Sequence, residues 1–188
     1  MIMNSEVSSP FKQRGISKVG EHIKLPVFYL LLAGSFAGWQ SLYNVHLDSL
    51  GYSSIQIGVL NAIFISMSAL VVPFWGVLAD KFGNNRVFLL LTSVAAVLVF
   101  FIGQTMVFQW MAIFIFLISV FHQPGGAVLD GMTMGFVRGN PRYSFGQFRL
   151  WNSAGYGLAS LVVGYFARYQ TGIIFNISAA LFLLLSIF

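Results

Sequence analysis

Long apolar stretches dominate this sequence, and they restrict its possible folds more than any other feature. Six runs each approach the roughly 20 apolar residues that an α-helix needs to cross a hydrocarbon core about 30 Å thick. Of the 188 residues, 57% are hydrophobic and 8% are charged, whereas soluble domains average about 25% charged residues. So few charges cannot cover the surface of a soluble domain. We therefore expect an all-α integral membrane protein.

Six membrane spans are predicted, and together they form one transmembrane bundle over residues 25–188. Residues 1–24 form a polar cytoplasmic segment without the apolar core of a signal peptide, so no cleavage is expected. The fourth span is the longest and contains Pro124, which removes a backbone N–H and predicts a kink. The spans are Leu25–His46, Ile55–Ala79, Val87–Thr105, Val107–Val137, Phe145–Ala167 and Gly172–Phe188.

The basic residues predict how the bundle is oriented. Eight of them lie before the first span or in the loops that follow spans two and four, all on one side of the membrane: Lys12, Arg14, Lys18, Lys24, Lys81, Arg86, Arg138 and Arg142. Only Arg168 lies on the other side. By the positive-inside rule, the N-terminus is cytoplasmic and the protein spans a membrane such as the bacterial cytoplasmic membrane. The net charge of +5 thus reflects topology, and no basic stretch with stacking aromatics indicates nucleic-acid binding.

Two charged residues lie inside predicted spans, where charges are rare and costly. Asp130 lies about eight residues before the turn between spans four and five and Arg149 about eight after it, so both sit roughly 9 to 12 Å inside the helix ends. They are expected to face each other across this hairpin. One interpretation is a buried ion pair that only fixes helix register. The favoured one is a carboxylate and a guanidinium that line a wet central cavity open to a polar solute or a proton.

Other polar residues inside the spans are weaker candidates. Gln40 and Asn44 lie four residues apart in the first span, so a continuous helix would place them on one face beside aromatic rings. They could line the cavity or form interhelical hydrogen bonds. His122 precedes the proline of the fourth span and is more often a structural residue than a proton carrier at such a break.

Several classes of chemistry find no support in the sequence. The chain has no cysteine, which excludes disulfides, thiolate metal sites and cysteine nucleophiles. It also lacks the G-x-S-x-G and H-E-x-x-H motifs of hydrolases and metalloproteases. We therefore predict no enzyme activity, no metal and no cofactor.

The loop between spans two and three is a tight turn with charges at both ends, running from Gly76 through Asp80, Lys81 and Gly83 to Arg86. Asp80 can accept hydrogen bonds from a helix N-terminus, where the helix dipole favours negative charge. Such a contact could act as a latch that forms in one conformation and breaks in another. A solvated turn that anchors the topology is an equal alternative.

This turn resembles motif A of the major facilitator superfamily, G-x-L-A-D-[RK]-x-G-[RK]-[RK], and it occurs where that motif belongs. The match covers Gly76, Leu78, Ala79, Asp80, Lys81 and Gly83. Asn84 and Asn85 replace the two following basic residues and leave Arg86 as the next base. The resemblance implies a gate at this turn that is weaker than usual or shifted by one residue.

The segment Phe145–Gly157 resembles span five of proton symporters related to lactose permease, the nucleoside symporters and the phenylpropionate permeases. Asn152 stands where that group usually has glycine. The resemblance implies that Asp130 and Arg149 bind substrate and that Tyr156 stacks on it. Compared with the charged pair, the weaker candidates for the same site are Tyr156, Trp151, Gln40 and Asn44.

The function that follows is that of the N-terminal half of a secondary transporter working by alternating access. By resemblance, the substrate is a sugar, nucleoside or aromatic acid carried with a proton, and a second six-helix half or a second copy of the chain completes the cavity. The partners are thus a small solute, a proton and the lipid bilayer. The alternative is a non-transporting six-helix membrane module or an inactive fragment.

Overall fold

The computed structural model of this chain describes residues 20–167 and 172–187, and the regular structure within them is entirely α-helical. The eight helices are α1 (Glu21–Gln40), α2 (Tyr43–Ser49), α3 (Ser54–Phe82), α4 (Asn84–Gln104), α5 (Phe108–Phe121), α6 (Gln123–Arg138), α7 (Phe145–Phe166) and α8 (Ile173–Ile187). Five residues used in the predicted topology lie outside the described part: Lys12, Arg14, Lys18, Arg168 and Phe188.

Each predicted span corresponds to one helix or to a pair of consecutive helices. Four stretches of the described chain are long and apolar enough to cross a membrane: Glu21–Ser49, Ser54–Phe82, Asn84–Gln104 and Phe108–Arg138. Helix α7 has 22 residues, but polar residues such as Arg149 and Asn152 lower its mean hydropathy. Helix α8 has 15 described residues, fewer than a full span needs. The structure thus supports an all-helical membrane protein, and six spans remain a prediction.

Two of the predicted spans are interrupted within the bundle. A turn at Ser41 and Leu42 separates α1 from α2 in the first span. In the fourth span, α5 ends and α6 begins on either side of His122. Pro124 has no N–H to donate, and the Gly125 N–H bonds instead to the His122 carbonyl, three residues back, at 3.1 Å. The break in the fourth span therefore lies just before Pro124, where the sequence predicts a kink.

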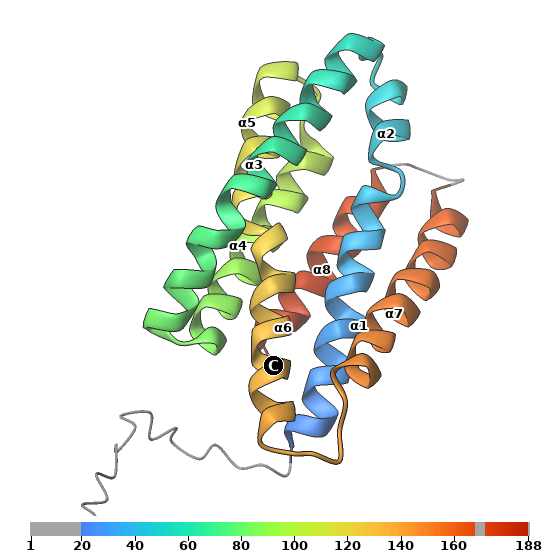
Figure 1. The fold of residues 1–188 in the computed structure, drawn as a ribbon. Coiled ribbons are helices and arrows are strands. Elements are labelled where there is room, and N and C mark those ends of the chain that lie inside the picture. Colours follow the sequence, from blue (N-terminus) through green and yellow to red (C-terminus); the bar gives the residue numbers. More distant parts are fainter. Residues whose placement is uncertain (1–19, 168–171, 188) are drawn as a thin grey trace, which may run out of the picture.

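The helices form a bundle in which α1 packs mainly on α7 and α8, α4 packs on α8, and α3 packs on α5 (Figure 1). The start of α1, the α3–α4 turn and the α6–α7 connection lie at the same end of the bundle (Figure 1). These are the segments that carry most of the described basic residues. Helix α3 exposes many large apolar side chains, among them Ile65, Leu70 and Phe74, which suits a helix surrounded by lipid.

Glycines let three pairs of helices approach closely. A Cβ on Gly155 in α7 would lie 2.8 Å from the Cα of Leu30 in α1. In the same way, Gly38 of α1 lies against Ser178 of α8, and Gly103 of α4 against Phe175. Small residues at crossings are the usual way to pack helices in a membrane, where no hydrophobic effect drives helices together. The α1–α7 contact fixes one side of the cavity described next.

Candidate functional site: a cavity between α1, α6 and α7

A cavity of about 380 Å³ opens between α1, α6 and α7, a size that suits a small organic solute. Helix α1 contributes the first four of its lining residues, α7 the last three, and α6 with the residue before it the others. The lining consists of Tyr29, Leu32, Ala33, Phe36, His122, Gln123, Gly126, Ala127, Asp130, Arg149, Asn152 and Tyr156.

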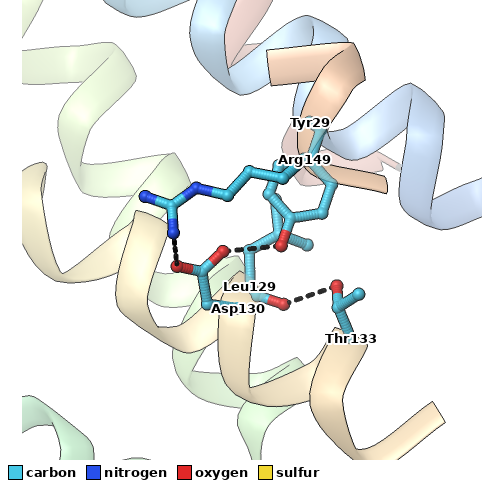
Figure 2. A network of polar contacts seen from close by, with 5 residues as sticks. All are labelled: Tyr29, Leu129, Asp130, Thr133 and Arg149. Atoms are coloured by element: carbon cyan, nitrogen blue, oxygen red, sulfur yellow. Dashed lines mark hydrogen bonds and ion pairs between the residues drawn. The ribbon is translucent and has the colours of Figure 1, made fainter. Parts of the chain in front are cut away.

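The polar centre of the cavity wall joins three helices (Figure 2). The Tyr29 hydroxyl of α1 donates a hydrogen bond of 2.6 Å to Asp130 Oδ1 of α6. On the other side of the carboxylate, Arg149 Nη1 of α7 lies 3.9 Å from Asp130 Oδ2. That separation is an ion pair but too long for a hydrogen bond. The carboxylate is thus held more closely by the tyrosine than by the arginine.

The Asp130–Arg149 pair is open rather than sealed under packed side chains. The side chain of Asp130 is 34% exposed and that of Arg149 is 63% exposed. Arg149 can present five N–H donors, and Asp130 Oδ2 retains free acceptor capacity. Together they offer donors and an acceptor to a solute that carries hydroxyl or amide groups.

The start of α7 determines where Arg149 points. Ser144 and Gln147 form a capping box in which the Ser144 N–H donates to Gln147 Oε1 at 3.1 Å. This cap fixes the first turn of the helix, and Arg149 follows in the second. Its guanidinium carbon lies 5.8 Å from the centre of the Phe145 ring, a weak cation–π contact at an exposed site. The local sequence therefore directs Arg149 toward α6.

Aromatic rings form another part of the wall. The rings of Phe36 and His122 stack with centres 4.8 Å apart and planes 13° apart. The ring of Tyr156 lies 6.3 Å from Phe36 at a tilt of 47°. Tyr156 follows Arg149 by seven residues, two helical turns, so both side chains face the cavity from the same side of α7.

Three other predicted site residues are not among the described residues that line this cavity. Trp151 follows Arg149 by two residues, about 200° around the helix, and so lies off the face that Arg149 and Tyr156 share. Gln40 is the last residue of α1, whereas Asn44 belongs to α2 beyond the turn. Asn44 accepts a hydrogen bond of 2.9 Å from Asn61 of α3. The predicted shared face of Gln40 and Asn44 assumed a continuous helix, and that premise is wrong.

The turn between α3 and α4 is a single residue, Gly83, with φ +94°. Residues that carry a side chain rarely adopt this backbone conformation, which explains why glycine occupies the position. Asp80, Lys81 and Arg86 are exposed around it, and no ion pair of Asp80 occurs among the described residues. Gly76 lies in α3, and no atom of another segment lies within 4 Å of a Cβ added to it.

Two cavity residues had no signal in the sequence that singled them out. Tyr29 is separated from Asp130 by 101 positions, and a tyrosine near the start of a span usually marks the membrane interface. Phe36 is one of 20 phenylalanines. The sequence connects Tyr29 and Phe36 only by their spacing of seven positions, which places both on one face of a helix.

No group of three or more metal-ligating side chains occurs in the described part of the chain.

A family profile, a curated protein and a solved structure that resemble this chain all belong to membrane transporters. The sequence profile of the MFS_1 like family, where MFS stands for major facilitator superfamily, matches residues 22–188. The sucrose permease of Escherichia coli is 27% identical over 141 residues, which cover 70% of this chain and 34% of the permease. A crystal structure of the nucleoside transporter NupG superimposes with a TM-score of 0.74 at 20% identity, covering 87% of this chain and 42% of the transporter.

The chain spans less than half the length of either relative. Both relatives are transporters rather than enzymes, and the structural likeness to NupG shows the fold. The family match covers every described residue except Gly20 and Glu21, and it includes the residues that line the cavity. The chain therefore belongs to the MFS_1 like family and corresponds to the N-terminal half of a major facilitator superfamily transporter.

Proposed function

We propose that this chain forms the N-terminal half of a proton-coupled symporter that binds a small polar or aromatic solute, such as a sugar, nucleoside or aromatic acid, at Asp130 and Arg149. The observation that carries the proposal is the open ion pair in the wall of a cavity between α1, α6 and α7. Tyr156 lines the same cavity and would contact the bound solute.

The energetics of charges in a membrane support a binding role for this pair. A charge inside a bilayer costs several kcal/mol or requires water or a partner. A pair retained only to fix helix register would gain most from tight, fully hydrogen-bonded packing. Asp130 and Arg149 instead stay 3.9 Å apart and partly exposed. This geometry leaves hydrogen-bonding capacity for a solute.

A second bundle would complete the binding site. In transporters of this kind, two helical bundles rock about a site near the middle of the membrane and expose it to each side in turn. The chain covers 34% of sucrose permease and 42% of NupG. We propose that a further six-helix half, or a second copy of this chain, faces the cavity. By the resemblance to lactose permease, most of the groups that carry the coupled proton would lie in that other half.

We further propose that the α3–α4 turn acts as a gate, with Gly76, Asp80, Lys81, Gly83 and Arg86 as its residues. Asp80 is exposed and forms no ion pair with the described residues, so it is available to a helix end of the second half. The N-terminus and this turn would face the cytoplasm of a bacterium.

Three predicted site residues lie off the cavity wall: Trp151, Gln40 and Asn44. They would contact the solute only in another conformation of the protein or beside the second half.

Uptake measurements test the proposal. The full-length protein from the native gene is reconstituted in liposomes and supplied with radiolabelled sugars, nucleosides and aromatic acids, with and without a proton gradient. We expect uptake of one class, loss of uptake in Asp130→Asn and Arg149→Lys, and normal membrane insertion of both variants. Normal uptake by both variants would overturn the site. If the variants changed only assembly or abundance, and no solute were carried, a non-transporting module would be the better description.

A further inference from the structure

We propose that Phe36, His122 and Tyr156 form a second subsite in the cavity, which receives the flat, nitrogen-containing ring of a neutral solute whose hydroxyl groups bind Asp130 and Arg149. This inference rests on the proposed transport function and narrows its substrate class. The solute it describes is a sugar joined to a nitrogen heterocycle, as in a nucleoside.

The cavity wall has two layers, and the same three segments of chain build both. The polar layer consists of Tyr29 from α1, Asp130 from α6 and Arg149 from α7. The aromatic layer consists of one residue from each segment, two turns away along the bundle: Phe36, His122 and Tyr156.

The spacing of the two layers sets the length of the ligand. Phe36 and Tyr156 each follow the polar residue of their helix by seven positions, and His122 precedes Asp130 by eight. At 1.5 Å per residue these intervals are about 10 to 12 Å. A ligand that contacts both layers therefore has two linked units rather than one ring.

The rings of the aromatic layer leave room for another flat ring. Phe36 stacks on His122 at 4.8 Å, yet it remains half-buried and lines the cavity. Tyr156 is 40% exposed and lies 6.3 Å from Phe36 at a tilt of 47°. Offset stacking and edge contacts between rings occur at centre distances of about 4.5 to 7 Å. A planar ring of the solute can thus extend this arrangement.

His122 gives the subsite its polar character. The residue is 6% exposed, and neither ring nitrogen has a hydrogen-bond partner among the described residues. Besides Phe36, it packs edge-on against Trp39 at 5.8 Å and Phe182 at 5.2 Å, and the Trp39 indole N–H also lacks a partner in the described part of the chain. Buried polar groups normally have partners because leaving them unpaired is costly. The N–H and C=O groups of a heterocycle would supply them after a rotation of the histidine ring.

The charges of the polar layer favour a neutral solute. Asp130 and Arg149 carry opposite charges and lie 3.9 Å apart, so the layer has no net charge. An aromatic acid would place its carboxylate beside that of Asp130, and like charges in such a site repel strongly. Hydroxyl groups, in contrast, can donate to Asp130 and accept from Arg149 at once.

The test compares ligands with and without a flat ring. Equilibrium dialysis with the full-length protein uses radiolabelled uridine and adenosine as probes and sucrose and ribose as comparison solutes. We expect a nucleoside to bind more tightly than sucrose or ribose. Phe36→Leu should weaken nucleoside binding about tenfold or more, since stacking on one aromatic ring commonly contributes this much, and should leave ribose binding unchanged.

Two further variants keep the test sharp. Phe101→Leu is the matched control, because Phe101 stacks on Phe114 at 5.7 Å and 12° outside the residues that line the cavity; it should leave binding unchanged. His122→Phe retains a ring beside Phe36 and removes two unpartnered nitrogens, so it should fold at least as well and still weaken nucleoside binding.

The outcomes separate this inference from the transport function. If sucrose or another solute without a flat ring is carried, and Phe36→Leu and His122→Phe leave its affinity unchanged while no nucleoside binds, the aromatic subsite is overturned and transport stands. Binding of nucleosides that is equally strong in Phe36→Leu would also overturn the subsite. If no probe binds and no solute enters the liposomes, both proposals fail.

Discussion

The hydroxyl of Tyr29 lies 2.6 Å from Asp130 Oδ1, whereas the guanidinium of Arg149 lies 3.9 Å from Asp130 Oδ2. The neutral partner is therefore hydrogen-bonded to the carboxylate, and the oppositely charged one is not. The short bond fixes the orientation of the carboxylate, because a hydrogen bond to a charged acceptor is stronger than one between neutral groups. Arg149 remains available to a solute as a result.

We expect Tyr29→Phe to lower the affinity for the transported solute about tenfold, which corresponds to about 1.4 kcal/mol. Without the hydroxyl, the Asp130 carboxylate can rotate toward Arg149 and occupy the donors that a solute would use. Equilibrium binding to the purified full-length protein measures the change.

Tyr52→Phe is the matched control for Tyr29→Phe. The Tyr52 hydroxyl donates a bond of 3.1 Å to the Met106 carbonyl, and neither residue lines the cavity. Its loss should lower the thermal midpoint slightly and leave solute affinity unchanged. The account would be contradicted if both variants lost stability to the same degree and neither changed affinity.

Gly155→Ala should destabilise the bundle by about 1 to 3 kcal/mol, the usual cost of overpacking. A Cβ at this position would meet the backbone of Leu30 and force α1 and α7 apart. Thermal unfolding in detergent, followed by circular dichroism, measures the change. Gly157→Ala is the control two residues along the same helix, where nothing lies within 4 Å of an added Cβ. Equal effects of the two substitutions would argue against the close α1–α7 contact.

Two glycines of the proposed gate, Gly83 in the α3–α4 turn and Gly76 in α3, should respond differently to alanine. Gly83 has φ +94°, so Gly83→Ala is expected to cost about 1 to 3 kcal/mol in backbone strain. Gly76 lies within α3 with space around it, so Gly76→Ala should preserve the thermal midpoint. If the turn is a gate, Gly76→Ala should nevertheless slow uptake, because the glycine would meet the second half when the transporter closes. Unchanged uptake in Gly76→Ala would remove Gly76 from the gate.

Much of the architecture could be predicted from the lengths of the apolar runs. The bilayer fixes the length of a spanning helix, and so each predicted span overlaps one helix or a pair of helices. The proximity of Asp130 and Arg149 also followed from their equal distances to one turn, because a short connection forces neighbouring helices to run antiparallel. The depth of a residue in the membrane can be estimated from one sequence, because it depends only on how many residues separate that residue from the end of its helix.

Contacts between residues far apart in the sequence could not be predicted from helix lengths and spacing. The Tyr29–Asp130 bond joins positions 101 apart, and it depends on which helices pack together. The interruption after Gln40 could not be foreseen either, because Ser41 and Leu42 are compatible with a continuous helix by propensity. Helical spacing therefore misplaced Asn44 relative to Gln40. Where the helix is continuous, two residues seven positions apart, Arg149 and Tyr156, both line the cavity, and Tyr156 had been named only through the family resemblance.

The central claim is that water and solutes reach the cavity beside Asp130 and Arg149, and a single thiol in the wall tests this most directly. This chain has no cysteine, so Asn152→Cys introduces a unique thiol in it, with any cysteines elsewhere in the full-length protein replaced by serine. The reference is Ser178→Cys, at a fully buried position between α1 and α8. With a charged maleimide that does not cross membranes, we predict rapid labelling of Asn152→Cys, slowed by the transported solute, and almost none of Ser178→Cys. Labelling of Asn152→Cys no faster than that of Ser178→Cys would contradict the account.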